Sequence, residues 1–323
     1  MTDTHHHAQV NHGQVNHAQV NHGQVNHGQV NHAQVNHGRA DHDGSPGVRV
    51  HRVQGGGGIG LSVLEAGDPA GPPILFLHGF CQSALAWRPL FQGPLAARFR
   101  LLAMDLRGHG GSDRPDAAGA PGPYADGDLW ADDVAGALAG LGMEKAVLVG
   151  WSYGGAVLAD HLRRHGAARV AGIVLAGACP RLGAAARPFM GPLGRQHFPA
   201  LMGGDFAAQV AACRALAHGM TVAPVAPEDL ETGIAATMSV PPAVRRGMMR
   251  READFDPVLA AYDGPALIVH GAEDRVVLPD LARHLAGLLP QARLHLYDGV
   301  GHAPFQERPD RFAADLAAFM DAL

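Results

Sequence analysis

The sequence has no continuous apolar run as long as a membrane-spanning helix requires, which is about 18 residues, and it has little charge of either sign. Charged residues make up 17% of the chain, and 25 lysines and arginines stand against 30 aspartates and glutamates. A nucleic-acid-binding surface needs an excess of basic residues, which is missing here. These absences argue against a membrane or a nucleic acid as a partner.

Cysteine is scarce as well. The three cysteines are Cys81, Cys179 and Cys213, and this small odd number forms no evident disulfide framework. Such a count is typical of proteins from a reducing compartment. The first residues also lack an apolar signal region, so we expect a cytoplasmic protein.

The motifs of two further kinds of site are missing. The glycine run Gly55–Gly58 lacks the Lys-Ser/Thr ending of a phosphate-binding loop. From residue 47 onward, no group of histidines, cysteines and carboxylates has the spacing of metal ligands. We therefore expect an active site that uses neither a metal ion nor an organic cofactor.

Residues 1–46 differ in composition from everything that follows. A five-residue repeat places a histidine at every fifth position from His7 to His42. This period matches neither a strand nor a helix, and the segment has few large apolar residues, so we expect it to be disordered. Two interpretations stay open: weak binding of nickel, zinc or copper by the imidazoles, or an incidental repeat, in part an added tag.

From residue 48 onward, short apolar runs alternate with longer helix-like stretches. The expected strands span residues 48–53, 59–65, 73–77, 99–104, 145–149, 170–176, 265–270 and 292–297. The expected helices span residues 84–96, 128–141, 153–165, 279–288 and 309–321. This alternation predicts an α/β fold with a mostly parallel sheet, whose active site lies at the carboxyl ends of the strands.

Residues 180–257 interrupt the alternation with mostly helical sequence that is punctuated by proline. This segment holds six of the chain's ten methionines: Met190, Met202, Met220, Met238, Met248 and Met249. Methionine adapts to irregular apolar surfaces. These side chains therefore suit either a pliable hydrophobic pocket or a small core within the segment, and both interpretations stay open.

The most informative motif is Gly150–Gly155, which reads Gly-Trp-Ser-Tyr-Gly-Gly. It lies between the apolar run 146–149 and a helix-like segment at 156–165, so Ser152 occupies the apex of a sharp strand-to-helix turn. Such a turn strains the backbone of the serine and exposes its hydroxyl, while the glycines keep neighbouring side chains away. This geometry suits a nucleophilic serine.

A serine, an aspartate and a histidine each follow a predicted strand, in that order along the chain. They are Ser152, Asp274 and His302, and the tripeptide His78–Phe80 follows an earlier strand in the same way. Together these motifs resemble the α/β-hydrolase superfamily, and specifically its serine esterase-like members with a helical cap. The resemblance covers roughly Val48–Leu323.

The resemblance implies a mostly parallel eight-stranded α/β-hydrolase sheet flanked by helices, with a helical cap inserted after the sixth strand. Residues 47–179 and 258–323 would form the hydrolase core. Residues 180–257 would form the cap, and residues 1–46 would be a tail outside both.

The same resemblance implies a catalytic triad in which Ser152 is the nucleophile, His302 the general base and Asp274 the acid that orients the imidazole. Residues 176–181, where some relatives carry the acid, contain no carboxylate. Glu273 lies beside Asp274, and we expect it to face solvent or to hydrogen-bond within its loop.

The backbone N–H groups of Phe80 and Tyr153 are the oxyanion-hole donors that the resemblance implies. Candidate residues for the substrate pocket are Trp151, Met238 and Met248. Many relatives have a histidine where this chain has Trp151, whose indole could equally pack beneath the turn.

These features predict a cofactor-independent serine hydrolase that cleaves small carboxylic esters through an acyl-enzyme. The same triad serves carbon–carbon bond hydrolases, lactonases, aminopeptidases and metal-free haloperoxidases, which are esterases able to perhydrolyse, so these reactions stay open. Two other classes also stay open: a slow-turnover ligand-binding or signalling protein, and a metal-binding protein whose tail is the functional part.

Overall fold

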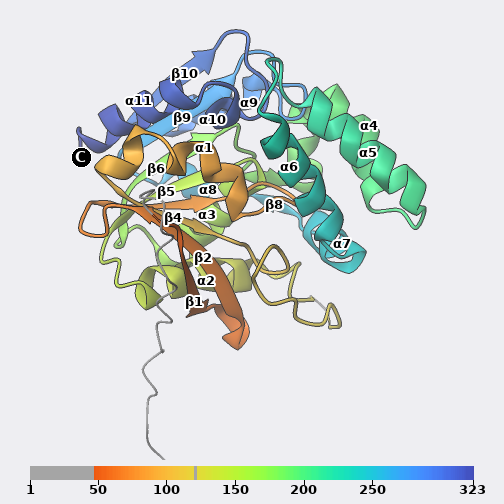
Figure 1. Cartoon of the computed structure of the whole chain (residues 1–323), viewed down its shortest axis with the longest axis horizontal. Coiled ribbons are helices and arrows are strands. Elements are labelled where there is room, and N and C mark those ends of the chain that lie inside the picture. The colour runs from red at the N-terminus through yellow and green to blue at the C-terminus, as the bar shows by residue number, and fades with distance from the viewer. Residues whose placement is uncertain (1–46, 120–121) are drawn as a thin grey trace, which may run out of the picture. The chain divides into compact units, whose positions relative to one another are not determined.

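The computed structural model describes residues 47–119 and 122–323 (Figure 1). The two expectations for residues 1–46, disorder and weak binding of transition metals, lie outside the described residues. Among the helices of the described part, none combines the length and the apolar character that crossing a bilayer requires.

The fold is built on an eight-stranded sheet. In spatial order its strands are β1 (Arg49–Gln54), β2 (Gly60–Gly67), β4 (Arg100–Met104), β3 (Pro73–Leu77), β5 (Ala146–Trp151), β6 (Val170–Ala176), β9 (Ala266–Gly271) and β10 (Ala292–Tyr297). The pairs β1–β2 and β2–β4 are antiparallel, and all other neighbouring pairs are parallel. The expected α/β fold and mostly parallel sheet are confirmed.

Helices cover both faces of this sheet (Figure 1). One apolar cluster lies between the strands and α2 (Gly127–Gly140), α3 (Tyr153–His165) and α9 (Pro279–Leu288). A second cluster lies between the strands and α1 (Arg88–Phe91), α10 (Pro304–Glu307) and α11 (Pro309–Met320). Because both faces are covered, the inner strands β5 and β9 are buried along their whole length, which explains their continuous apolar sequences.

The expected helix at residues 84–96 is wrong in its continuity. The structure divides this stretch into a 3-10 turn at Ala84–Trp87, the short α1, and a second 3-10 turn at Pro94–Ala97. Proline lacks the backbone N–H that continues a helix. Pro94 follows Gly93 and therefore separates α1 from the turn beyond it.

The segment between β6 and β9 lies outside the strand–helix alternation. Its helices are η4, a 3-10 helix (Gly183–Phe189), α4 (Pro192–Leu201), α5 (Phe206–Gly219), α6 (Pro227–Ser239), α7 (Pro242–Met249) and α8 (Asp256–Ala260). The short strands β7 (Arg181–Leu182) and β8 (Ala253–Asp254) pair antiparallel and bring its two ends together. We use the term cap for residues 180–257, as the sequence suggests.

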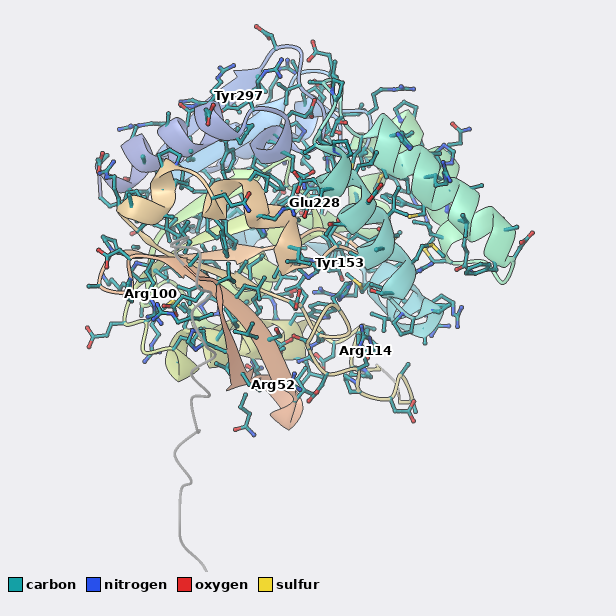
Figure 2. The ribbon with its side chains drawn as sticks, viewed as in Figure 1. Arg52, Arg100, Arg114, Tyr153, Glu228 and Tyr297 are labelled. Atoms are coloured by element: carbon teal, nitrogen blue, oxygen red, sulfur yellow. The ribbon has the colours of Figure 1, made fainter. Side chains whose placement is uncertain are left out.

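The cap has a small apolar cluster of its own. Leu201, Ala212 and Cys213 form the cluster where α4 packs along α5, and Met238 of α6 packs against it (Figure 1). Polar contacts attach α6 to the core: Arg88 pairs with Asp229 at 2.8 Å and with Glu228, which is labelled in Figure 2.

Candidate active site

Ser152 lies in the predicted sharp turn between β5 and α3. Its backbone has φ 53° and ψ −118°, a region that L-residues other than glycine rarely adopt. The flanking glycines are required sterically: a β-carbon at Gly150 would lie 2.8 Å from the carbonyl oxygen of Gly154, and one at Gly154 would lie 2.2 Å from that of Leu77. The surrounding backbone therefore holds Ser152 in its strained conformation.

Asp274 and His302 meet in the loops that follow β9 and β10. The Nδ1 atom of His302 lies 2.7 Å from Oδ2 of Asp274, and both side chains are buried. The other carboxylate oxygen, Oδ1, accepts hydrogen bonds from the backbone N–H groups of Val276 at 2.8 Å and Val277 at 3.0 Å. An ionised carboxylate only accepts hydrogen bonds, so His302 donates through Nδ1 and its Nε2 is left as the basic nitrogen.

The electrostatic surroundings keep Asp274 ionised. Burial alone would raise its pKa, but His302 and His270 outweigh that effect and hold the pKa of Asp274 below its usual range. The Nε2 atom of His270 lies 3.0 Å from Oδ2 of Asp274. Asp274 can therefore orient the imidazole and stabilise a positive charge on it.

Ser152 and His302 line the same cavity, together with Gly79 and Phe80. Two glycines allow the close approach of these loops. A β-carbon at Gly79 would lie 3.1 Å from Cβ of Ser152. Gly177 has φ 49°, and a β-carbon there would lie 2.7 Å from the carbonyl oxygen of His302. The structure thus brings together the predicted serine, the histidine and one of the predicted oxyanion-hole residues.

Phe80 and Tyr153, the predicted donors of the oxyanion hole, follow β3 and begin α3 respectively. Buried His78 supports the first of these loops: its Nε2 accepts from the backbone N–H of Leu106 at 3.0 Å, and its Nδ1 therefore donates to the Gly79 carbonyl at 2.8 Å. Burial lowers the pKa of His78 to about 4, so its ring is neutral at pH 7.

The side chain of Tyr153, which is labelled in Figure 2, is buried, and its hydroxyl accepts a hydrogen bond from Nη1 of Arg251 at 3.1 Å. Burial raises the pKa of Tyr153 to about 12. Arg251 belongs to the cap and also pairs with buried Asp160 of α3. Tyr153 therefore connects the turn of Ser152 to the cap.

Trp151 has both of the roles that the sequence left open. It lines the cavity of Ser152, and it packs beneath the turn against Phe305 with ring centroids 5.1 Å apart. Its indole Nε1 also donates to the carbonyl oxygen of His302 at 2.9 Å. The indole thus fixes the backbone of the histidine loop.

Two cavities meet at Ser152. The first, about 60 Å³, lies toward α5 and α6, and the second, about 460 Å³, lies toward η4 and α4. Their shared lining residues are Phe80, Ser152, Phe198 and Val276. A scissile bond beside Ser152 would therefore have separate spaces for the groups on its two sides.

The structure separates the two methionines that were predicted for the pocket. Met248 lines the second cavity. Met238 is not among the described residues that line either cavity, because α6 turns it toward the cluster of Leu201, Ala212 and Cys213. The expectation that Met238 faces the substrate pocket is therefore wrong. Other cap methionines also line a cavity: Met220 lines the first, and Met190, Met202 and Met249 line the second.

Glu307 is a residue that sequence reasoning missed. Its buried carboxylate accepts hydrogen bonds from the backbone N–H groups of Val222 at 2.7 Å, Ala223 at 3.0 Å and Gly301 at 2.8 Å. Beside it, the N–H of His302 donates to the carbonyl oxygen of cap residue Met220 at 2.6 Å. Glu307 thus joins the turn between α5 and α6 to the histidine loop. No motif in the sequence marks such a link.

Several other polar residues have structural roles. Glu273 is exposed, and its carboxylate accepts the backbone N–H of Val300, in the loop that follows β10, at 3.0 Å. Arg107 pairs with buried Asp133 at 2.7 Å. Among residues 47–119 and 122–323, no group of three or more histidine, cysteine or carboxylate side chains could hold a metal ion.

A model of the alpha/beta hydrolase family matches residues 74–315. The chain belongs to the α/β-hydrolase family. The solved structure of an esterase from Rhodococcus sp. ECU1013 is similar to it, with 34% identity, a TM-score of 0.78, and coverage of 85% of this chain and 99% of the esterase. The family and this relative identify the chain as a hydrolase enzyme.

Two curated relatives are peroxidases by name. A non-heme haloperoxidase from Rhodococcus erythropolis is 32% identical over 272 residues, which cover 78% of this hydrolase and 93% of the relative. A non-heme chloroperoxidase from Streptomyces lividans is 30% identical over 277 residues, which cover 81% and 96% of the two chains. The hydrolase is therefore similar to proteins named for two different reactions.

Proposed function

We propose that this hydrolase cleaves small carboxylic esters through an acyl-enzyme on Ser152. His302 Nε2 takes the proton of the serine hydroxyl as Oγ attacks the ester carbonyl carbon. The oxyanion of the tetrahedral intermediate accepts hydrogen bonds from the N–H groups of Phe80 and Tyr153. His302 then protonates the departing alcohol, and the acyl group stays on Ser152.

Water completes the reaction. His302 removes a proton from water, the hydroxide attacks the acyl carbonyl, and Ser152 leaves with a proton from His302, which releases the carboxylic acid. Asp274 keeps His302 in the tautomer that accepts through Nε2, and it stabilises the imidazolium in both halves of the cycle. No step needs a cofactor.

One observation carries this proposal. Strained Ser152 and buried His302 line one cavity, and the Nδ1 atom of His302 is hydrogen-bonded to the buried carboxylate of Asp274. That combination supplies a nucleophile, its base and the group that orients the base. In this proposal residues 47–179 and 258–323 supply the reacting groups, and residues 180–257 cover them and select the substrate.

The difference in size between the two cavities favours esters with one small and one larger substituent. The lining of the second cavity is largely apolar and includes Leu182, Ala186 and several methionines, so it suits a hydrocarbon group. We expect short to medium chains, because the cap is modest in length.

Perhydrolysis is the second candidate, because two of the relatives are named as non-heme peroxidases. Here hydrogen peroxide would replace water in the second half of the cycle. It would attack the acyl-enzyme and leave as a peracid, and His302 would return the proton to Ser152. Both reactions use the same acyl-enzyme, so they differ only in which nucleophile the site admits.

A substrate panel tests both candidates. Purified enzyme is assayed with esters of graded chain length, lactones, amides and 2-hydroxydienoate-type ketones, and the esters are repeated with hydrogen peroxide. Steady hydrolysis of esters that Ser152→Ala abolishes is the expected result. Peracid formation that outpaces hydrolysis at equal acyl donor would favour the second candidate. Turnover of the ketones alone would overturn both.

A further inference from the structure

The second cavity is unusual in its charge. Its lining residues include four arginines, Arg181, Arg187, Arg195 and Arg251, but one carboxylate, that of Glu252. The remainder of the wall is mostly apolar. A cavity that is apolar in its walls and positive in its charged residues suits an amphiphilic ligand with an anionic end.

Two of the four arginines are neutralised by aspartates outside the cavity lining. Arg251 pairs with Asp160, and both side chains are buried. Arg181 binds Asp254 at 2.9 Å and also pairs with Asp256. These two guanidinium groups therefore add little net charge to the cavity, and they serve chiefly to hold its walls.

Arg187 of η4 and Arg195 of α4 differ from that pair. Both are exposed, and neither forms an ion pair with any acidic side chain of residues 47–119 or 122–323. The one carboxylate of the lining, Glu252, accepts the backbone N–H of Ala184 at 2.7 Å and pairs with neither arginine. The mouth of the cavity thus carries two guanidinium groups without a matching negative charge in the described structure.

We propose that the second cavity binds the larger half of an ester whose far end is a carboxylate, and that Arg187 and Arg195 recognise this carboxylate. The proposal rests on the ester hydrolysis proposed above. The apolar walls would take the hydrocarbon chain, the reacting carbonyl would lie at Ser152, and the anion would reach the mouth. A guanidinium suits this role because it presents paired N–H donors that match a carboxylate.

The test compares matched substrates that differ at one end. In the first pair, aryl esters carry an acyl chain that ends in a methyl or a carboxylate group. In the second pair, acetate esters carry an alcohol chain with the same two endings, and both pairs are made in several chain lengths. The quantity measured is the ratio of kcat/KM for the anionic member to kcat/KM for the neutral member.

The ratio is measured for the wild type, for Arg187→Gln with Arg195→Gln, and for Arg293→Gln as control. Arg293 is an exposed arginine on β10 that also lacks an ion pair in the described residues, and it does not line the cavity. We expect the double variant to lower the ratio about tenfold in at least one pair, because kcat/KM falls more for the anionic ester than for the neutral one, and we expect Arg293→Gln to leave the ratio unchanged. Added salt should lower the wild-type ratio in the same pair.

A further variant distinguishes a loss of charge recognition from a loss of folded structure. Arg187→Glu and the single variant Arg187→Gln are therefore measured as well. Arg187→Glu should lower the ratio further than Arg187→Gln, and hydrolysis of the neutral ester shows that the active site is still folded. An unchanged ratio in both pairs, with normal turnover of neutral esters, would overturn this inference alone. Absence of turnover for every ester in the wild type would overturn the proposed function instead.

Discussion

The core loops and the cap of this hydrolase hold their residues in different ways. Ser152, Asp274 and His302 lie on loops of the sheet and are fixed by backbone contacts and hydrogen bonds on several sides; Asp274 and His302 are buried, and Ser152 is partly buried. The cap residues around the second cavity include exposed arginines and Met249, which is 39% exposed. We propose that the chemistry depends on the closely packed frame of the sheet loops, whereas substrate choice depends on cap side chains that can adapt.

Glu307 and Arg251 connect these two regions. Glu307 binds the turn between α5 and α6 to the histidine loop, and Arg251 binds the cap to Tyr153 of the nucleophile turn. Both side chains are buried. The effect of a substitution should therefore depend on its place: in the triad loops that form the frame, in the Glu307 and Arg251 connections, or in the adaptable cap wall of the second cavity.

The largest effect should come from the frame itself. Ser152→Ala should lower kcat for esters by about 10⁴–10⁶-fold, because it removes the nucleophile, while the fold stays intact. The matched control is Ser239→Ala, which changes an exposed serine of α6 and should leave kcat unchanged. Activity of Ser152→Ala within tenfold of the wild type would show that another residue is the nucleophile.

Asp274→Asn should have the second largest effect, a loss of about 10⁴-fold in kcat. The amide keeps the size of the carboxylate but favours the wrong tautomer of His302. Glu273→Gln, one residue away, should have a small effect because Glu273 binds the backbone of Val300 rather than the histidine. Equal losses in the two variants would mean that the acid is wrongly assigned.

The pH dependence of stability should also identify Asp274. Its pKa in the folded protein is lower than the unfolded value of about 4, so its ionised form stabilises the fold. This contribution is fully present above pH of about 4 and is lost as the pH falls toward the folded pKa. Thermal unfolding between pH 3 and pH 7 should therefore show a smaller acid-dependent loss in Asp274→Asn than in the wild type.

A substitution at a residue that connects the core and the cap should have an intermediate effect on kcat. Glu307→Gln leaves one oxygen to accept hydrogen bonds from three backbone N–H groups, and each buried donor left unpaired costs about 1–3 kcal/mol of unfolding free energy. We expect a lower melting temperature and a loss of about tenfold in kcat, with little change in KM for short esters, because His302 shifts. Glu231→Gln, at an exposed site on α6, is the control. A loss of stability at full kcat would show that the link is structural only.

The adaptable wall should show the smallest effects, and they should concern selectivity. Met248 lines the second cavity, whereas Met238 packs within the cap. Met248→Ala should change the ratio of kcat/KM between short and longer esters by about tenfold, since one methylene contact is worth about 1–3 kcal/mol. Met238→Ala should lower stability and leave that ratio unchanged. The reverse pattern would contradict the placement of these two side chains.

Much of the fold could be predicted from the sequence because its signals are local. A buried strand followed by a glycine-rich turn marks both the sheet and the position of Ser152, and the strands near Asp274 and His302 are equally distinct. The expected helix at residues 84–96 is instead divided into short turns, and one of the divisions falls at Gly93–Pro94.

The remainder depends on contacts between distant segments. Glu307 bonds to residues more than 80 positions away, and no local pattern announces this. Met238 and Met248 are alike in sequence terms, and only the packing of α6 and α7 decides which one faces the cavity. Pairings of this kind arise from tertiary structure, so local sequence patterns do not reveal them.

The central claim is that Ser152 carries the acyl group, and mass spectrometry of the trapped intermediate tests it most directly. Wild type and Ser152→Ala are mixed with an excess of an activated aryl ester, quenched in acid within milliseconds, and digested for peptide mapping. We predict one acyl group per wild-type chain, located on Ser152, appearing with a stoichiometric burst of the aryl alcohol, and no adduct in the variant. An acyl group on another residue, or catalytic turnover without any burst or adduct, would contradict the account.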